Sequence, residues 1–506
     1  MSIRSYDQLK AALGCLIVGD DLTAKTVRGS AWLGTGSIVE QAARFARNML
    51  LARLLAPAAF GTMAIVLSSG ALIETITDVG VWLAIIQNPR GGRDAYVNAS
   101  WWIGMGRATL SYLTIFTVAP WIATFYGHAE LSGLLRVALL GTVFNAAISP
   151  RSILVQRNMK FPRWAGITNG GAICGVMLTV VLSFAIRDVW ALAVGYCSEN
   201  IFRFVLSYLL CPGLPSRKCD WSAVRDLLTF SRGLLGLALL NLIIARSDIF
   251  VLARLYSPTG LGLYTMAVAL VTTPSVFFTN VLGKALMPAL SSVQNDMERL
   301  NRILVKVTSL LILAGIPVVA FIALCAASLL RVIYGNRYVE AVGPLSVASA
   351  VVFLVIVNAA VTGVLLATGR PQLHRQAVAA TAAIILITIY PACRVLGFIG
   401  GQLAALLAVA VGYLLQLVRV HAVTNLNMSR YGAAFVPAAL GCAGMMGVVL
   451  GGRWLGLATR PAADICLCLG GCVAAYAICA SDRVRALGRL DSLFSPGTGD
   501  VAALGQ

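Results

Sequence analysis

The sequence predicts an all-α, polytopic membrane protein: about 14 transmembrane helices in two pseudo-symmetric six-helix bundles plus two C-terminal helices. Two observations predict this fold class. Of the 506 residues, 59% are hydrophobic and only 12% are charged, whereas a soluble domain carries about a quarter charged residues. In addition, one motif recurs in the two halves of the chain. Internal repeats on this scale are a common plan of membrane transporters.

The repeated motif has the pattern LARLxxPxxxG and occupies residues 51–61 and 252–262. All matched residues are displaced by 201 positions, so the two copies align without a gap. Arg53 and Arg254 are expected at helix ends near the water interface, and the proline of each copy in the first turn of the next helix. Chance similarity is the alternative, but six identities in eleven positions favour duplication.

Apolar segments of about 20 residues, the length that crosses a bilayer, define the order of the helices. The first bundle is expected to contain spans near 28–53, 58–85, 99–124, 131–153, 163–186 and 189–211. A charged break at 212–220 precedes the second group, expected near 227–254, 259–286, 304–332, 342–367, 376–393 and 396–419. Two more spans are expected near 431–452 and 461–480.

These spans set the predicted domain boundaries. We expect a cytoplasmic N-terminal tail, a first bundle, a cytoplasmic linker, a second bundle, two additional helices and a cytoplasmic C-terminal tail, at 1–27, 28–211, 212–226, 227–420, 431–480 and 481–506. Within the helices, Gly171-x-x-x-Gly175 and Gly447-x-x-x-Gly451 are small-residue spacings that predict close helix approach.

The net charge of +19 comes from 39 basic and 20 acidic residues. The basic residues form no stripe interleaved with aromatic residues, so nucleic acid is not an expected partner. They gather instead in every second loop, which marks the cytoplasmic side of a membrane protein. With the N-terminus inside, this bias persists along the chain and predicts that both termini lie in the cytoplasm. No convincing secretory signal is seen.

Three charged residues fall inside the first expected span. Glu40, Arg44 and Arg47 are four and three positions apart, which places them on one helical face. That face must meet protein or water, because a central Arg in lipid costs about 2.5–3.5 kcal/mol even on mild scales. A structural Glu40–Arg44 ion pair is one interpretation, but it leaves the charge of Arg47 unexplained.

Further charges lie in or near other spans. Arg107, Arg136 and Arg246 join the three residues above as candidates for lining a substrate cavity between the bundles. Such a cavity suits an anionic substrate, because the planar guanidinium matches phosphate. Candidates for an ion-coupling carboxylate are Asp78, Glu199 and Asp248, and Glu199 is spaced to pair with Arg203 on one helix face.

No pattern typical of an enzyme competes with transport. The chain has three histidines, all at expected loops or span ends, and no Walker loop, GxSxG or HExxH motif. Seven cysteines lie singly in apolar runs, namely Cys15, Cys174, Cys197, Cys211, Cys325, Cys442 and Cys472, and no histidine joins the neighbouring Cys466 and Cys468 at metal-ligand spacing. We therefore expect no enzyme activity, no cofactor and no metal. We also expect the cysteines to be buried. An ion gradient, the membrane potential or the substrate's own gradient would drive transport.

Several segments together resemble the polysaccharide transporter (Wzx-type oligosaccharide flippase) family, within the multidrug/oligosaccharidyl-lipid/polysaccharide exporter superfamily. The likeness runs from about residue 27 to 420 and rests on the order and spacing of 51–61, 78–81, 84–87, 155–161, 282–291 and 366–371. It implies alternating-access translocation of an undecaprenyl-diphosphate-linked oligosaccharide for exopolysaccharide, capsule or O-antigen. It also implies that Arg44, Arg47 and Arg246 are placed to receive the diphosphate.

The resemblance further implies membrane lipids as partners, along with a polysaccharide polymerase and a chain-length regulator. Two other functions stay open on the sequence. An ion-coupled multidrug/cation antiporter of the same superfamily would favour an acidic cavity, whereas the surplus here is basic. A membrane-embedded polymerase or glycosyltransferase would carry a sizeable catalytic loop, and the loops between the expected spans are short.

Overall fold

The computed structural model describes residues 22–78, 80, 85, 89–158, 161–216, 220–231, 235–457 and 460–487. Most of the two predicted tails therefore lies outside the described residues. Every regular element in the described ranges is helical. These residues form two compact units: the first draws on Met1–Phe277 and Ile385–Gly401, and the second on Phe278–Ile384 and Gln402–Gln506. The functional boundaries expected from the sequence, including the linker at 212–226, stay a prediction.

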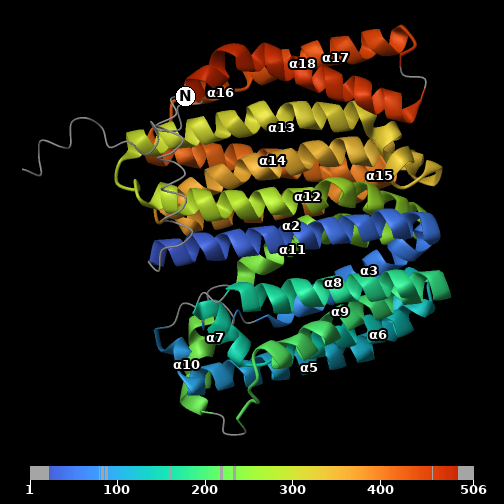
Figure 1. Cartoon of the computed structure of the whole chain (residues 1–506), viewed down its shortest axis with the longest axis vertical. Coiled ribbons are helices and arrows are strands. Elements are labelled where there is room, and N and C mark those ends of the chain that lie inside the picture. The colour runs from blue at the N-terminus through green and yellow to red at the C-terminus, as the bar shows by residue number, and fades with distance from the viewer. Residues whose placement is uncertain are drawn as a thin grey trace, which may run out of the picture. The chain divides into compact units, whose positions relative to one another are not determined.

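The first unit contains one long helix for each of the first six expected spans. These are α2 (Leu22–Leu54), α3 (Pro57–Thr77), α5 (Asp94–Tyr126), α6 (Glu130–Ala146), α8 (Phe161–Ile186) and α9 (Val189–Leu210). The shorter elements are η1 (Pro89–Gly92), α7 (Arg151–Arg157) and α10 (Trp221–Ser231), followed by α11 (Leu235–Leu255) and the start of α12 (Pro258–Ser291). Helices α5, α6, α8 and α9 pack side by side, with α7 and α10 at one end (Figure 1).

The second unit contains the rest of α12 and most of the helices that follow. These are α13 (Met297–Ile333), η2 (Asn336–Ala341), α14 (Val342–Ala367), α15 (Pro371–Thr424), α16 (Met428–Gly432), α17 (Val436–Trp454) and α18 (Pro461–Leu487). Helix α15 is two helices joined at Gly397, whose φ of 65° and ψ of −141° are not helical. Glycine adopts this conformation without a steric cost. With α15 counted as two, the described chain has the expected 14 long helices.

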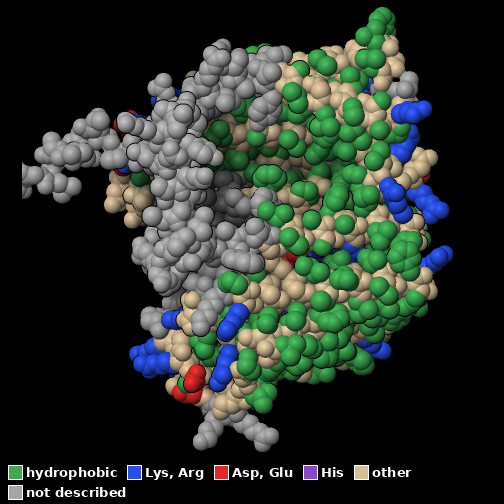
Figure 2. Space-filling view, viewed as in Figure 1, with side chains coloured by type: hydrophobic (Ala, Val, Ile, Leu, Met, Phe, Trp, Pro, Cys, Tyr) green, Lys and Arg blue, Asp and Glu red, His purple; other side chains and the backbone are tan. Residues whose placement is uncertain are grey.

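The chain is a multi-pass membrane protein. Nine of its described helices are long and apolar enough to cross a bilayer by length and composition. Helix α2 is less apolar because of its charged residues, and α6 has only 17 residues. Large apolar side chains on α5 and α8 are exposed, among them Trp121 and Met177. In the first unit they cover the sides of the helices, while Lys and Arg gather around α7 and α10 (Figure 2).

The two copies of the repeated motif have matching surroundings. Leu51 and Leu252 are fully buried, while Arg53 and Arg254 are exposed at the ends of α2 and α11. The proline of each copy is the first residue of the next helix, α3 or α12, as the sequence predicts. The exposed positions of the two arginines are also as predicted. The burial of the two leucines and the first residues of the two following helices are thus the same in both copies of the motif.

The glycines that end the two copies bring α3 and α12 into direct backbone contact. A Cβ on Gly61 would collide with the Pro258 carbonyl and the Gly262 N–H, and a Cβ on Gly262 would collide with the Pro57 carbonyl and the Gly61 N–H. The contact is therefore reciprocal, as a duplicated pair related by an approximate two-fold axis requires. We call this contact the glycine joint.

Candidate functional site

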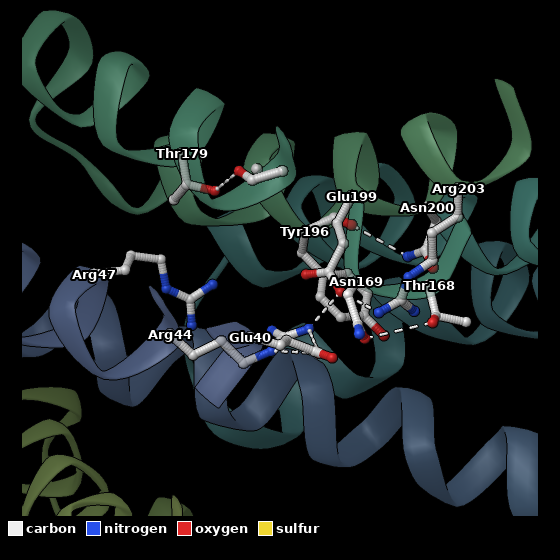
Figure 3. A network of polar contacts seen from close by, with 12 residues as sticks. Glu40, Arg44, Arg47, Thr168, Asn169, Thr179, Tyr196, Glu199, Asn200 and Arg203 are labelled. Atoms are coloured by element: carbon white, nitrogen blue, oxygen red, sulfur yellow. Dashed lines mark hydrogen bonds and ion pairs between the residues drawn. The ribbon is translucent and has the colours of Figure 1, made fainter. Parts of the chain in front are cut away.

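Charged side chains inside the first unit form a connected network between α2 and α9 (Figure 3). On α2, Arg44 Nε donates to Glu40 Oε1 over 3.0 Å, and its NH2 group lies 2.5 Å from Glu199 Oε1 on α9. The spacing of four positions places Glu40 and Arg44 on one helical face, as the sequence predicts. The structure confirms the Glu40–Arg44 ion pair, which is one part of a larger network.

Arg203 extends this network along α9. Its NH2 group lies 2.6 Å from the same Glu199 Oε1 that Arg44 contacts, which confirms the predicted pairing of Glu199 with Arg203. One carboxylate oxygen therefore holds two guanidinium groups. The Glu199 side chain is only 8% exposed, so this shared oxygen lies where water screens charge poorly.

Two glycines on α8 allow α9 to bring these charged residues close. A Cβ on Gly171 would collide with the backbone and side chain of Arg203, and a Cβ on Gly175 would collide with those of Glu199. The predicted close approach at Gly171-x-x-x-Gly175 is therefore confirmed, and it fixes the position of both charged residues. The same prediction is wrong for Gly447 and Gly451, since no atom of the described residues lies within 4 Å of a Cβ placed on either.

Arg47 lies one turn further along α2 and has different surroundings. Its Nε and NH2 groups donate to the Asn48 side-chain oxygen over 3.3 and 3.1 Å. Within the described residues, no carboxylate forms an ion pair with Arg47. The network of Glu40, Arg44, Glu199 and Arg203 has two charges of each sign, so Arg47 leaves this region with one surplus positive charge.

A cavity of about 420 Å³ adjoins the network. It lies among the first part of α5, the end of α6, α7 and the first part of α8, and Arg203 of α9 also lines it. Two predicted site residues, Arg107 and Asp78, are in its lining. All the described residues that line this cavity belong to the first unit, and the expected cavity between the two bundles stays a prediction.

Arg136, another predicted cavity residue, contacts the outer part of α5 instead. Its guanidinium carbon lies 4.2 Å from the centre of the Phe116 ring, and its Nε and NH2 groups approach the Phe116 carbonyl oxygen at 3.4 and 3.3 Å. Phe116 is itself exposed. The structure therefore gives Arg136 a cation–π contact, and the substrate role of Arg136 stays a prediction.

The remaining predicted residues lie on α11. Arg246 is exposed, whereas Asp248 accepts a hydrogen bond of 2.5 Å from the hydroxyl of Tyr264 on α12. The two side chains are two positions apart and have different surroundings, as the sequence predicts. Neither belongs to the described network around Glu199. Their roles in substrate binding and ion coupling stay predictions.

One cluster in the second unit has metal-binding atoms. Cys325 on α13 and Asp464 and Cys468 on α18 are buried and place one ligand atom each within 4.8 Å of one another. Asp464 already accepts hydrogen bonds from Arg453 and Ser328, and the positive charge of Arg453 opposes a cation there. Sequence spacing could not reveal this group, because Cys325 and Asp464 are 139 positions apart.

The structure adds residues that the sequence analysis did not select. Arg203 links the ionic network to the cavity, and its spacing from Glu199 was the available signal. Trp101 and Trp164 line the cavity, and no periodic pattern distinguishes them from other interfacial aromatic residues. Cys466 is exposed, contrary to the expectation of buried cysteines, whereas Cys325 and Cys468 are buried as expected.

Residues 50–343 match the protein family described as polysaccharide biosynthesis protein. This match covers more than half of the chain. The chain belongs to the polysaccharide biosynthesis protein family. The matched range includes Arg203, Glu199 and the whole of the cavity lining. The end of α2 that carries Glu40, Arg44 and Arg47 precedes it.

Curated relatives extend the likeness of this family member over much of the chain. It is 21% identical over 407 residues to the lipopolysaccharide biosynthesis protein WzxC of Escherichia coli, covering 78% of this chain and 79% of WzxC. It is 24% identical over 325 residues to the succinoglycan biosynthesis transport protein ExoT of Rhizobium meliloti, covering 63% and 65%. The teichuronic acid biosynthesis protein TuaB of Bacillus subtilis is 21% identical, covering 59% and 62%.

Solved structures show the fold of this polysaccharide biosynthesis protein. The lipid II flippase MurJ, in an inward closed conformation, superposes with a TM-score of 0.72 at 12% identity, covering 92% of this chain and 100% of MurJ. An inward-facing multidrug resistance transporter of the MATE family superposes with a TM-score of 0.58 at 15% identity, covering 76% and 95%. The fold is therefore that of polytopic transporters, and at these identities the likeness extends to the fold alone.

Proposed function

We propose that this protein is a flippase for surface polysaccharide biosynthesis. It moves an undecaprenyl-diphosphate-linked oligosaccharide repeat unit from the cytoplasmic to the periplasmic leaflet of the bacterial inner membrane by alternating access. The observation that carries the proposal is the network of Arg44, Glu199 and Arg203, with Arg47 adding a positive charge that no described carboxylate offsets. Membership of the polysaccharide biosynthesis family and the names of its relatives support the substrate class.

The network suits a diphosphate because Glu199 holds its arginines in place while engaging only some of their N–H donors. Arg44 and Arg203 share one oxygen of Glu199, so each gives only part of its donor set to that carboxylate. A guanidinium carries five N–H donors in a planar fork that matches phosphate oxygens. In the proposed mechanism the diphosphate binds Arg47 and takes over donors of Arg44, while Glu199 keeps Arg203.

The direction of transport rests on the predicted orientation. Basic residues in alternate loops support a multi-pass inner-membrane protein with both termini in the cytoplasm. The lipid tail stays in the bilayer while the sugars cross through the protein. Asp78, Glu199 and Asp248 are the proposed candidates for an ion-coupling carboxylate. A polymerase and a chain-length regulator are the proposed partners that use the translocated unit.

The proposal is tested in a strain that lacks this gene. The undecaprenyl-linked intermediates are extracted, and the leaflet that holds them is measured with a membrane-impermeant glycosidase or lectin. We expect oligosaccharide trapped on the cytoplasmic face and loss of polymer. Normal polymer without trapped lipid, in a strain with no second flippase gene, would contradict the proposal.

Complementation of the same strain then tests the arginines. Arg44→Ala and Arg47→Ala should reduce export about tenfold or more, because a hydrogen bond to a charged group contributes about 1.5–3 kcal/mol. Arg53→Ala, an exposed arginine on the same helix, is the matched control and should export normally. Arg246→Ala measures whether α11 shares the site. Wild-type export by Arg44→Ala and Arg47→Ala, at normal protein levels, would eliminate the proposed diphosphate site.

A multidrug/cation antiporter of the same superfamily is the second candidate. The partly buried hydrogen bond between Asp248 and Tyr264 is the observation that favours it, since such a carboxylate suits proton coupling. Substrate-dependent drug efflux from vesicles, abolished by Asp248→Asn, would support the antiporter. The surplus positive charge near Arg47 opposes a cationic substrate.

A further inference from the structure

We propose that the cavity of the first unit is a sugar-binding subsite that holds one pyranose residue of the transported glycan. The class of ligand rests on the proposed function, but the site itself is argued from its own chemistry. Its volume of about 420 Å³ falls in the range of about 300–1,000 Å³ typical of small-molecule sites. Its lining combines aromatic side chains, hydroxyl groups and arginines.

Two tryptophans supply apolar surfaces for a sugar ring. Trp101 and Trp164 both line the cavity, from α5 and α8. Trp101 donates its indole N–H to the Ile148 carbonyl oxygen over 3.1 Å, which fixes the plane of its ring. The C–H groups on one face of a pyranose carry partial positive charge and so attract the negative face of an aromatic ring. A fixed tryptophan therefore offers a ready stacking surface.

The polar groups of the cavity match the mixed donors and acceptors of a sugar. Ser100 Oγ donates to the Val97 carbonyl oxygen, and Thr168 Oγ1 donates to the Trp164 carbonyl oxygen. Each hydroxyl group has one O–H donor, and these two bonds already use it. Its oxygen can therefore accept a hydrogen bond from a sugar hydroxyl. A purely apolar ligand would leave the acceptor capacity of these oxygens unused in a desolvated site.

Arginines supply the donors that the hydroxyls lack. Among the described residues, Arg107 donates one hydrogen bond, to the Glu74 carbonyl oxygen at a long 3.4 Å. Arg203 gives its NH2 group to Glu199, while its Nε is buried and has no hydrogen-bond partner in the described part of the chain. Asp78 also lines the cavity and adds acceptor oxygens. The set therefore suits a neutral or acidic pyranose better than a phosphate alone.

The position of the cavity agrees with loading of substrate. The first part of α5, the end of α6 and the first part of α8 adjoin loops that the sequence places in the cytoplasm. Arg203 lines the cavity and also pairs with Glu199, which holds Arg44. A sugar in the cavity would thus lie beside the residues proposed to take the diphosphate, and its fit would contribute to the choice of glycan.

Two glycines on α5 give a matched test that avoids loss of the fold. No atom of the described residues lies within 4 Å of a Cβ placed on Gly104 or on Gly106, so a larger side chain fits at both. Gly104 lines the cavity, whereas Gly106 is exposed and is absent from its lining. Gly104→Leu should fill the cavity, while Gly106→Leu should leave it open. Trp164→Ala and Trp121→Ala, an exposed tryptophan of α5 that is absent from the lining, form a second matched pair.

The measurement is the binding of methyl glycosides to the purified full chain in nanodiscs, monitored by saturation-transfer NMR. The probes are the methyl glycosides of glucose, galactose, N-acetylglucosamine and glucuronic acid. We expect saturable binding of at least one probe, weakened at least tenfold by Gly104→Leu and by Trp164→Ala and unchanged by Gly106→Leu and Trp121→Ala. No saturable binding of any probe, or equal binding by Gly104→Leu, would overturn the subsite.

Transport in the same variants separates this inference from the proposed function. Arg44→Ala should lose translocation of the lipid-linked repeat unit yet still bind the glycoside. If the wild-type protein translocates the repeat unit and Gly104→Leu does so at the same rate, the subsite falls and the flippase stands. If the wild-type protein binds a glycoside but moves no lipid-linked oligosaccharide, the subsite stands and the flippase falls.

Discussion

Helices α2 and α11 carry the two copies of the repeated motif, yet they differ in the charges that precede it. In both copies a buried Leu and an exposed Arg occupy the same places, and a proline starts the next helix. The displacement of 201 positions pairs Arg44 with Ala245 and Arg47 with Asp248. The packing surface has stayed the same after duplication, whereas the charged face has changed sign at one position and lost its charge at another.

This difference separates two roles within one repeat. The glycine joint and the buried leucines serve the packing of the helices, so both copies need them. Arg44 belongs to an ionic network on α9, and α11 has Asp248 hydrogen-bonded to Tyr264 instead. Arg246, which the sequence places on the equivalent helix, aligns with Phe45 and not with either arginine of α2. Shared position in a repeat therefore predicts packing better than it predicts chemistry.

The largest expected effect comes from breaking the part that the copies share. Gly61→Leu and Gly262→Leu should each destabilise the fold by more than about 3 kcal/mol, because the new side chain meets backbone and not a movable side chain. Thermal unfolding in detergent and the amount of protein in the membrane measure this. Gly106→Leu, where the space is open, should unfold like the wild type. Tolerance of leucine at only one joint position would contradict a reciprocal contact.

An intermediate effect should distinguish the two acidic residues. Glu199→Gln leaves Arg203 without its carboxylate partner and Arg44 with Glu40 alone, and should cost about 3 kcal/mol, the lower end for a broken buried ion pair, because both arginines keep some exposure. Asp248→Asn keeps an acceptor for Tyr264 and should cost about 1 kcal/mol. Chemical unfolding of both variants checks the order. Equal losses would mean that the two halves hold their carboxylates in similar ways.

The smallest effect should come from the exposed arginines of the repeat. Arg53→Ala and Arg254→Ala should each change stability by about 0.5 kcal/mol or less, as surface substitutions usually do. Arg254 lies 5.6 Å from the centre of the Phe125 ring, so its loss should be slightly the greater of the two. Unfolding midpoints measured side by side test this. A large loss in either variant would show that the motif end is more than a helix terminus at the interface.

Much of the fold could be predicted from local sequence. Apolar segments predicted the order of the 14 long helices, and the break predicted at 394–395 lies two residues before the non-helical Gly397 of α15. The small-residue spacing at Gly171 and Gly175 predicted a close contact that the structure confirms. The same spacing at Gly447 and Gly451 failed, because a spacing shows that two glycines share a helix face but not what that face meets.

The site was less predictable because its members come from distant parts of the chain. Glu40 with Arg44 and Glu199 with Arg203 are neighbours on their own helices, so spacing was enough to pair them. The contact between Arg44 and Glu199 spans 155 positions and depends on how the helices pack. Likewise, only packing shows that Arg107 lines the cavity, while Arg136 stacks on Phe116.

The glycine joint couples the sequence changes that the two copies of the motif can tolerate. Gly61 receives the backbone of α12, and Gly262 receives the backbone of α3, so a change at either glycine disturbs the same contact from opposite sides. Neither copy is therefore free to drift alone at this point, even though the charged faces of α2 and α11 have diverged. The glycine joint would keep the ancestral duplication recognisable in the sequence after most other matched residues had been replaced.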